Sequence, residues 1–184
     1  MIISHKHKFI SLDPPKTGTN YRQNLLWNFG DYVQVLQHAN LAEVQNYFHE
    51  FNLSDYFIFT FVRNPWDRFL SYYNWHNWPL NPDSFRSWLK GHLGRQHAKS
   101  QSHWYIQDGV IVTDFIGSLE NMNKDMKLIL NKINLPLALP SKKSNLSKQR
   151  VNYQDFYNQE LIDLVAKKEK SVIELKGYDY ITQA

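Results

Sequence analysis

The sequence of 184 residues contains no cysteine. This excludes a disulfide-stabilised scaffold, a zinc or iron–sulfur site with cysteine ligands, and a cysteine nucleophile. No stretch approaches the roughly 18 consecutive apolar residues that a membrane-spanning helix requires. The N-terminal segment Met1–Lys8 lacks the long apolar region of a secretory signal peptide. We therefore expect a soluble, cytoplasmic protein with no membrane span.

The composition favours a folded protein with a single domain. Hydrophobic residues make up 42% of the chain and aromatic residues 15%, which excludes global disorder. A chain of this length can bury about 70% of its unfolded surface, so we predict one domain over residues 1–184. The formal net charge is +4. This small excess suits an anionic ligand but is too diffuse to indicate nucleic acid by itself.

Short apolar runs alternate with helical patterns along the chain. The clearest strand, Tyr56–Val62, is apolar on both faces, as expected of a central parallel strand. Other strands are predicted over 8–12, 32–36 and 110–115, the last after a hairpin turn at Asp108-Gly109. Helices are predicted over 21–29, 41–51, 65–75, 83–89, 119–133 and 155–168, and loops over 91–103 and 135–149. The alternation predicts an α/β fold with a mostly parallel central sheet.

The segment Pro14–Asn20 joins the first predicted strand to the first predicted helix. Gly18 lets the backbone approach a ligand closely, and the amides that follow lie at a helix N-terminus, which favours an anion. Lys16 adds a full positive charge. The remaining polar side chains of the segment are Thr17, Thr19 and Asn20. The order differs from a Walker A motif, in which a lysine follows the second glycine. An ordinary turn with a surface lysine is the alternative interpretation.

Arg63 directly follows the predicted central strand, at its carboxyl end. Ligands of open α/β sheets bind at that edge, and a guanidinium can bind a phosphate through two parallel hydrogen bonds. Asn64 is a good N-cap and Pro65 suits the first helical position, so a helix should begin here. Ser71 lies two turns along that helix and could donate to the same phosphate. A structural salt bridge is the alternative role for Arg63.

These segments are similar to motifs of a known enzyme family. Pro15–Thr19 resembles the 5′-phosphosulfate loop of the sulfotransferases that use 3′-phosphoadenosine 5′-phosphosulfate (PAPS). Val62–Arg68, with Ser71, resembles their 3′-phosphate motif, including the spacing from arginine to serine. Weaker similarity to the Golgi-type carbohydrate sulfotransferases and their bacterial relatives, the family 2 branch, covers His103-Trp104, residues 114–117, Glu120-Asn121, residues 145–147 and residues 157–180.

The resemblance implies a P-loop-like, three-layer α/β fold with a central sheet flanked by helices. It also implies an enzyme that moves the sulfuryl group of PAPS to a hydroxyl acceptor by in-line displacement, with a carbohydrate as the expected acceptor. Adenosine 3′,5′-bisphosphate is then the product, and no metal is required. Lys16 would neutralise charge on the leaving phosphate. The expected nucleotide contacts are Lys16, Thr17, Gly18, Thr19, Asn20, Arg63 and Ser71.

The acceptor hydroxyl needs a general base, and a histidine suits neutral pH. His38 follows the second predicted strand, which would place it at the carboxyl edge of the sheet beside the phosphate loop. The family's catalytic His or Glu comes from this general region, so we predict His38 as the base. His103 and His76 are the other candidates. A capping or surface role is the alternative for His38.

Two other function classes stay open. A P-loop-like nucleotide or sugar kinase is disfavoured because Gly-Lys-Ser/Thr and an obvious magnesium-binding carboxylate are both missing. A non-enzymatic polyanion-binding module would use basic loops and aromatic residues, with steep salt dependence. The aromatic run Trp75–Trp78 could stack on sugar rings or pack in the core. We expect no nucleic acid partner; a glycan, a glycolipid, a small alcohol and a tyrosine hydroxyl remain open as acceptors.

Overall fold

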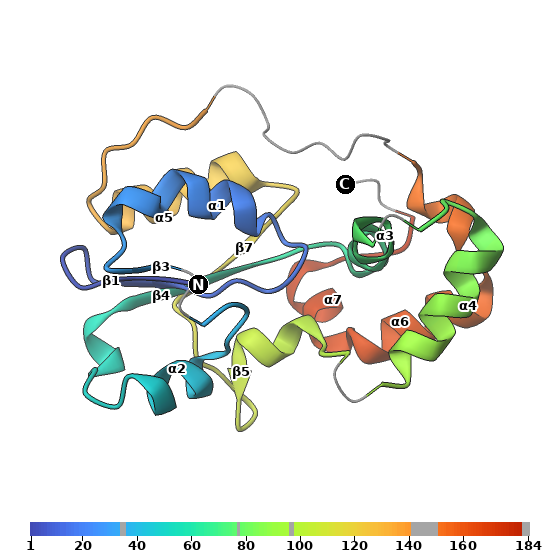
Figure 1. The fold of residues 1–184 in the computed structure, drawn as a ribbon, viewed down its shortest axis with the longest axis horizontal. Helices are drawn as coiled ribbons and strands as arrows, with labels where there is room; N and C mark the ends of the chain where they lie inside the picture. Colours follow the sequence, from blue (N-terminus) through green and yellow to red (C-terminus); the bar gives the residue numbers. More distant parts are fainter. Residues whose placement is uncertain (34–35, 77, 96–97, 141–150, 182–184) are drawn as a thin grey trace. The chain divides into compact units, whose positions relative to one another are not determined.

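The computed structural model describes residues 1–33, 36–76, 78–95, 98–140 and 151–181. These residues form two compact units, each built from two separate parts of the chain (Figure 1). The first unit takes in the described residues of Met1–Val62 and His103–Leu146. The second takes in those of Arg63–Ser102 and Ser147–Ala184. Every helix in the described ranges is too short or too polar to cross a membrane.

A five-stranded sheet with the order β3-β1-β2-β4-β7 forms the centre of the first unit. Its strands are β1 (Ile2–Ser4), β2 (Phe9–Ser11), β3 (Tyr32–Val33), β4 (Phe57–Val62) and β7 (Phe115–Ser118). β1 is antiparallel to both β2 and β3, while β2, β4 and β7 are parallel neighbours. All strands except β1 therefore run in the same direction, which confirms the prediction of a mostly parallel sheet.

Helices cover both faces of this sheet. α1 (Thr19–Leu26) and α5 (Met122–Lys132) lie on one face, and α2 (Leu41–Tyr47) lies on the other (Figure 1). Successive side chains of a strand point to opposite faces. Accordingly, Phe9 and Phe59 pack in the core with α1 and α5, whereas Ile10 and Ile58 pack in the core with α2. The three-layer α/β arrangement is thus as predicted.

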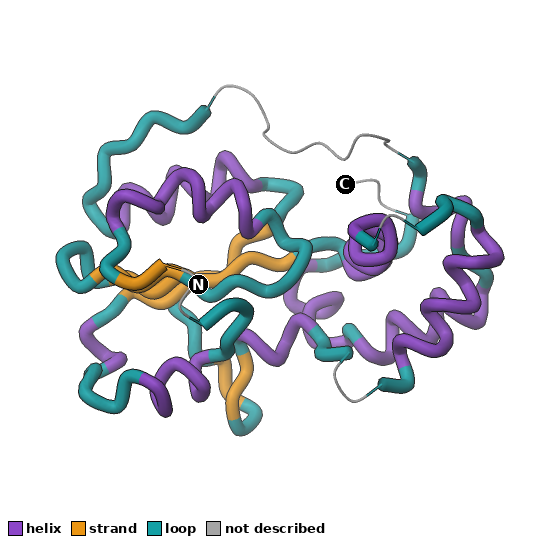
Figure 2. The backbone as a smooth tube through the Cα atoms, in the orientation of Figure 1, coloured by secondary structure: helices purple, strands orange, loops and turns teal. Residues whose placement is uncertain are grey.

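The second unit is helical (Figure 2). Its helices are α3 (Pro65–Trp75), α4 (Pro82–Leu93), α6 (Gln159–Lys168) and α7 (Lys170–Lys176). Aromatic side chains dominate its core, including Trp66, Phe69, Tyr73, Phe85 and Tyr157. The Asn64 side chain accepts hydrogen bonds from the amides of Trp66 and Asp67. This is the N-cap that the sequence predicted, and it places Arg63 just before α3.

The other short elements are a hairpin and several 3₁₀ turns. β5 (Ile106–Gln107) pairs with β6 (Val110–Ile111) around the predicted Asp108-Gly109 turn. The 3₁₀ turns cover Trp27–Phe29, Leu53–Asp55, Gln101–Trp104 and Tyr153–Phe156.

Several predicted boundaries were wrong. The strand predicted over 110–115 is two strands, because β6 pairs with β5 whereas β7 pairs with β4 in the central sheet. α4 is longer than predicted, and the helix predicted from residue 155 is a 3₁₀ turn followed by α6. The loop predicted over 91–103 contains the end of α4 and the buried Gln101. Residues 34–35 of the second predicted strand and the family-like segment 145–147 lie outside the described residues.

Candidate active site

The loop between β2 and α1 has the backbone of an anion site. Lys16 has a φ of 68° and Gly18 a φ of 81°, both in the left-handed region. Gly18 is the N-cap of α1, and no side chain caps this helix. Within the described part of the chain, the amides of Thr19 and Asn20 have no hydrogen-bond partner. The first N–H groups of α1 are therefore available to an anion at the positive end of the helix dipole.

Gly18 is required by space as well as by conformation. A Cβ atom at this position would lie 2.5 Å from Cε of Met122 and 2.8 Å from Cδ1 of Leu119. The loop is therefore packed against the beginning of α5. Glycine adopts the left-handed backbone without strain, and a larger residue would require the Met122 and Leu119 side chains to shift.

The two threonine hydroxyls of the loop are used within the loop. Oγ1 of Thr17 donates to the carbonyl of Pro14 at 2.8 Å, and Oγ1 of Thr19 donates to the same carbonyl at 3.2 Å. Thr17 is fully buried, whereas Asn20 is exposed on the first turn of α1. Both hydroxyl protons are thus already donated within the loop, so these two predicted contact residues can bind an anion through their backbone amides.

A buried ion-pair network supports the loop. The carboxylate of Asp13 accepts hydrogen bonds from Arg22 and Gln23, each at 2.8 Å, and from the ammonium group of Met1 at 2.6 Å. Arg22 also donates to the carbonyl of Thr17 at 2.6 Å. Burial alone would raise the pKa of Asp13, but Arg22 and the ammonium group outweigh it and lower that pKa below its ordinary value. Arg22 thus connects the start of the loop to its middle.

His38 lies beside the same loop. Its Nδ1 is 2.6 Å from the carbonyl oxygen of Asp13. Because a carbonyl can only accept, we assign the proton to Nδ1, and Nε2 of the neutral ring then has the lone pair. No hydrogen bond to Nε2 occurs in the described part of the chain. The His38 ring is therefore oriented to accept a proton at Nε2.

The structure brings His103 close to His38. The indole Nε1 of Trp104 donates to the backbone carbonyl of His38 at 2.9 Å, and Nε2 of His103 is 3.0 Å from the side-chain amide nitrogen of Asn40. Both histidine candidates therefore belong to one cluster of the first unit. His76, the third candidate, belongs to the second unit.

The predicted 3′-phosphate residues both belong to the second unit. Nε and Nη2 of Arg63 lie 2.8 Å and 2.6 Å from the same Asp67 carboxylate oxygen, so the salt bridge that the sequence left open is present. The Arg63 side chain is still partly exposed, at 17%. Ser71 is half-buried on α3, and its hydroxyl has no partner among the residues that the structure describes. Phosphate binding by this pair stays a prediction.

Two buried residues that were not predicted as site residues hold these motifs. Arg22 supports the β2–α1 loop, and Gln101 bonds to the backbone of Arg63 through both atoms of its side-chain amide. A charged residue beside the apolar positions of the first helix was a weak signal for Arg22. No pattern indicated Gln101, because it lies in a polar stretch predicted to be a loop.

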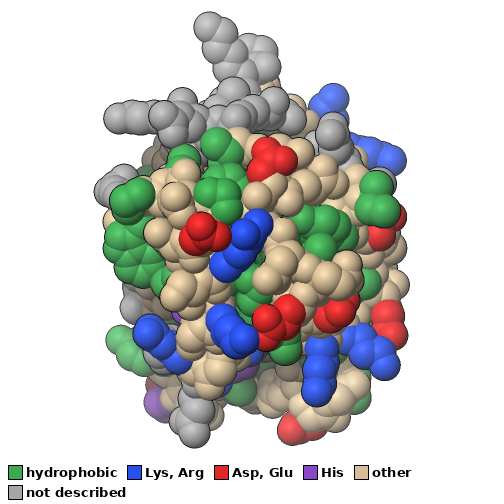
Figure 3. Space-filling model, turned by 90° about the vertical axis from the view of Figure 1, so that its right-hand side faces the viewer, with side chains coloured by type: hydrophobic (Ala, Val, Ile, Leu, Met, Phe, Trp, Pro, Cys, Tyr) green, Lys and Arg blue, Asp and Glu red, His purple; other side chains and the backbone are tan. Residues whose placement is uncertain are grey.

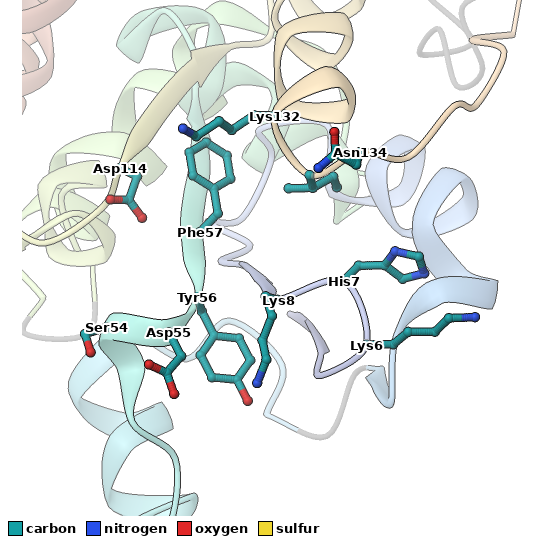
Figure 4. Close-up of a pocket in the computed structure, with 11 residues that line it drawn as sticks. Lys6, His7, Lys8, Ser54, Asp55, Tyr56, Phe57, Asp114, Lys132 and Asn134 are labelled. Carbon is teal, nitrogen blue, oxygen red and sulfur yellow. The ribbon is translucent and has the colours of Figure 1, made fainter.

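A cavity of about 580 Å³ opens at the opposite end of the sheet, where the parallel strands β2, β4 and β7 begin (Figure 4). Its lining comes from the β1–β2 turn, the beginning of β4, the residue before β7 and the end of α5: Lys6, His7, Lys8, Ser54, Asp55, Tyr56, Phe57, Asp114, Lys132, Ile133 and Asn134. None of the predicted site residues lines this cavity. Among the described residues, no group of three His, Asp or Glu side chains could hold a metal ion.

Comparison with known proteins gives one match. A family model described as "Sulfotransferase family" matches residues 1–174. Neither the curated proteins nor the solved structures give a significant match. The matched range contains both predicted phosphate motifs.

Proposed function

We propose that this chain, which belongs to the family 2 branch of the sulfotransferase family, transfers the sulfuryl group of PAPS to a carbohydrate hydroxyl as one catalytic domain over residues 1–184. Membership makes the protein a sulfuryl transferase with a hydroxyl-bearing acceptor, and its fold is P-loop-like, as predicted. The donor, the class of acceptor and the roles of individual residues are the proposal.

The loop between β2 and α1 is the observation that carries this proposal. PAPS supplies an activated sulfuryl group, with adenosine 3′,5′-bisphosphate as the leaving group. Two left-handed residues and the uncapped start of α1 suit its phosphosulfate. The amides from Thr17 to Asn20 would hold the oxygens, and Lys16 would offset the negative charge that develops on the leaving phosphate.

His38 would act as the general base. The carbonyl of Asp13 orients the ring through Nδ1, so Nε2 is the atom that accepts the proton of the acceptor hydroxyl. The carboxylate of Asp13 also accepts a hydrogen bond from Arg22, and Arg22 donates a second one to the carbonyl of Thr17. Asp13 thereby connects the proposed base, His38, to the phosphate loop.

Arg63 and Ser71 would recognise the 3′-phosphate of the nucleotide. The carboxylate of Asp67 holds the guanidinium of Arg63 in a defined plane, so the side chain is ordered before a ligand binds. A charged group that is already ordered loses less conformational entropy when it binds.

Exposed aromatic rings in the second unit support a carbohydrate acceptor. Trp75 is 64% exposed and Trp78 is 41% exposed. The ring of His76 stacks on Trp78 with 4.5 Å between centroids. Broad indole faces with polar edges suit the apolar faces and hydroxyl groups of a sugar ring. Trp75 is therefore not a core residue, whereas Trp78 also packs beside the buried Tyr73, with 5.2 Å between ring centroids.

A polyanion-binding module receives less support. The face of the molecule in Figure 3 shows acidic and basic side chains beside one another. In the second unit, Lys90 pairs with Glu160 at 2.6 Å and Arg86 pairs with Asp83 at 3.2 Å. Such pairing offsets the charge of these basic side chains, whereas a polyanion site needs a continuous basic patch.

Thermal unfolding with three ligands tests the proposal. Adenosine 3′,5′-bisphosphate at a hundred times its Kd should stabilise the fold by about 2.7 kcal/mol. For a chain of this size that raises Tm by about 5–11 °C. ATP and a single-stranded oligonucleotide should have much smaller effects. Equal stabilisation by ATP would favour the kinase, and stabilisation by the oligonucleotide alone would favour the polyanion module.

Transfer assays then test the acceptor. Sulfuryl transfer from labelled PAPS should occur to oligosaccharides and not to tyrosine peptides. Transfer to the peptides alone would overturn the carbohydrate assignment and leave the PAPS assignment in place.

A further inference from the structure

Arg63 occupies the position where the chain leaves the central strand. The β4–β7 ladder ends at the pair Val62–Ser118, and the amide of Leu119 donates the last bond, to the carbonyl of Val62, at 2.8 Å. Arg63 therefore lies one residue beyond the last pair of the ladder. Backbone polar groups that are shielded from water need hydrogen-bond partners.

The side chain of Gln101 supplies both partners. Its Oε1 accepts from the amide of Arg63 at 2.9 Å, and its Nε2 donates to the carbonyl of Arg63 at 2.9 Å. Gln101 has no exposed surface. Two bonds exchanged with one residue are what an antiparallel strand neighbour would provide. Gln101 thus fixes the backbone from which the Arg63 side chain extends.

Glu169 holds Gln101 in place. This fully buried carboxylate lies at the junction of α6 and α7. Its Oε2 accepts from the amide of Gln101 at 3.0 Å and from the hydroxyl of Ser100 at 3.1 Å. Its Oε1 accepts from Nη1 of Arg68 at 3.0 Å. A buried charge is kept where partners satisfy it, and here those partners join the helix junction to the loop of Gln101 and to α3.

We infer that Gln101 is a positioning residue that holds Arg63 for the 3′-phosphate of the nucleotide, with Glu169 as its anchor. The inference rests on the proposed function, in which Arg63 binds that phosphate. A guanidinium that makes two parallel bonds tolerates little displacement. Loosening the backbone of Arg63 should therefore weaken recognition of the 3′-phosphate and spare recognition of the 5′-phosphate.

Two substitutions in the full chain test the inference. Gln101→Glu keeps the shape of the side chain but places a carboxylate oxygen against the Arg63 carbonyl. Gln101→Met removes both bonds without adding a charge. Matched controls are Gln154→Glu and Gln154→Met, because Nε2 of Gln154 also donates to backbone carbonyls in the same unit, those of Tyr180 and Ile181, at 3.1 Å and 3.3 Å. Should Gln101→Met fail to fold, Gln101→Asn replaces it with the same expectation.

The readout is the affinity for adenosine 3′,5′-bisphosphate relative to that for adenosine 5′-phosphate, measured by calorimetry. Both Gln101 variants should reduce this ratio at least about tenfold, since a misplaced bidentate contact loses most of its directional strength. Both Gln154 variants should keep the ratio of the wild type, even where Tm falls. A purely structural role of Gln101 would lower Tm without changing the ratio.

The outcomes separate the two proposals. If the wild type binds both nucleotides equally, the proposed 3′-phosphate site is wrong and the role of Gln101 is wrong with it. If the wild type discriminates and Gln101→Met keeps the full ratio, the positioning role is wrong and the proposed function stands. A loss in Gln101→Glu alone would be an effect of the added charge and would also overturn the positioning role.

Discussion

Gly18→Ala tests whether the phosphate loop depends on its left-handed residue and on its contact with α5. The new Cβ atom would lie 2.5 Å from Cε of Met122. That atom is the end of a flexible side chain, so it can shift, but Met122 is buried in the core with α1 and α5. Gly109→Ala is a close control. It has a φ of 79° in the same unit, and its Cβ would meet nothing within 4 Å.

The two substitutions share one cost and differ in another. A left-handed backbone costs an alanine about 1–2 kcal/mol relative to glycine. Overpacking a buried site adds about 1–3 kcal/mol, and only Gly18→Ala bears this second cost. The free energy of unfolding should therefore fall by about 1–2 kcal/mol in Gly109→Ala and by about 2–5 kcal/mol in Gly18→Ala.

Urea unfolding followed by circular dichroism gives both free energies, and calorimetry gives the affinity for adenosine 3′,5′-bisphosphate. Gly109→Ala should bind like the wild type. Gly18→Ala should bind more weakly, because moving Gly18 moves the amides that follow it. Equal losses of stability together with unchanged affinity in both variants would refute the reasoning about this loop.

Four further substitutions test the remaining assignments. Lys16→Ala should reduce the single-turnover rate sharply and nucleotide affinity less, because the charge matters most as the leaving group becomes anionic; a rate within a few-fold of wild type contradicts this role. Ser71→Ala should weaken binding of adenosine 3′,5′-bisphosphate by about 1.5–3 kcal/mol and leave adenosine 5′-phosphate unaffected in calorimetry, whereas equal losses would indicate a folding defect. His38→Ala should abolish transfer from labelled PAPS and preserve nucleotide binding, because only the proton acceptor is lost; if His103→Ala abolishes transfer while His38→Ala retains it, the two roles exchange. Because the pKa of Asp13 is lowered in the folded state, its carboxylate stabilises the fold fully at pH values above the ordinary carboxyl pKa. This contribution to the free energy of unfolding is lost as the pH falls through the lower folded-state pKa. Asp13→Asn should therefore flatten the acid limb of stability against pH in urea unfolding, and an unchanged limb would show that other carboxylates cause it.

Local sequence patterns correctly predicted the elements that depend on interactions between residues close together in the chain. The run Tyr56–Val62 is apolar on both faces, and β4 covers Phe57–Val62. Asn64 caps α3 with the predicted bonds, because an N-cap depends only on the next few amides. The strand predicted over 110–115 failed for the opposite reason. An apolar run does not reveal which strand it pairs with. Here the beginning of the run belongs to β6, which pairs with β5, and its end belongs to β7, which pairs with β4 in the central sheet.

In the candidate site, too, some features could be predicted from the sequence and others depend on the fold. The order of residues in the two phosphate motifs was visible in the sequence, and membership of the sulfotransferase family is confirmed. The roles of Lys16, Arg63, Ser71 and His38 remain predictions. Burial of the Thr17 hydroxyl against Pro14 and the orientation of His38 by Asp13 appear only in the folded chain.

The sequence by itself determined the family, the α/β class and the places where strand, loop and helix succeed one another, because periodicity and capping act between near neighbours. Tertiary structure decided what holds the motifs. Gln101 is 38 residues from Arg63 and 68 residues from Glu169. A hydrogen bond between such distant residues produces no periodic pattern in the sequence around either of them. The same glutamine and glutamate could equally stand in a loop exposed to solvent. Burial alone turns them into obligatory partners, and burial is a property of the whole fold.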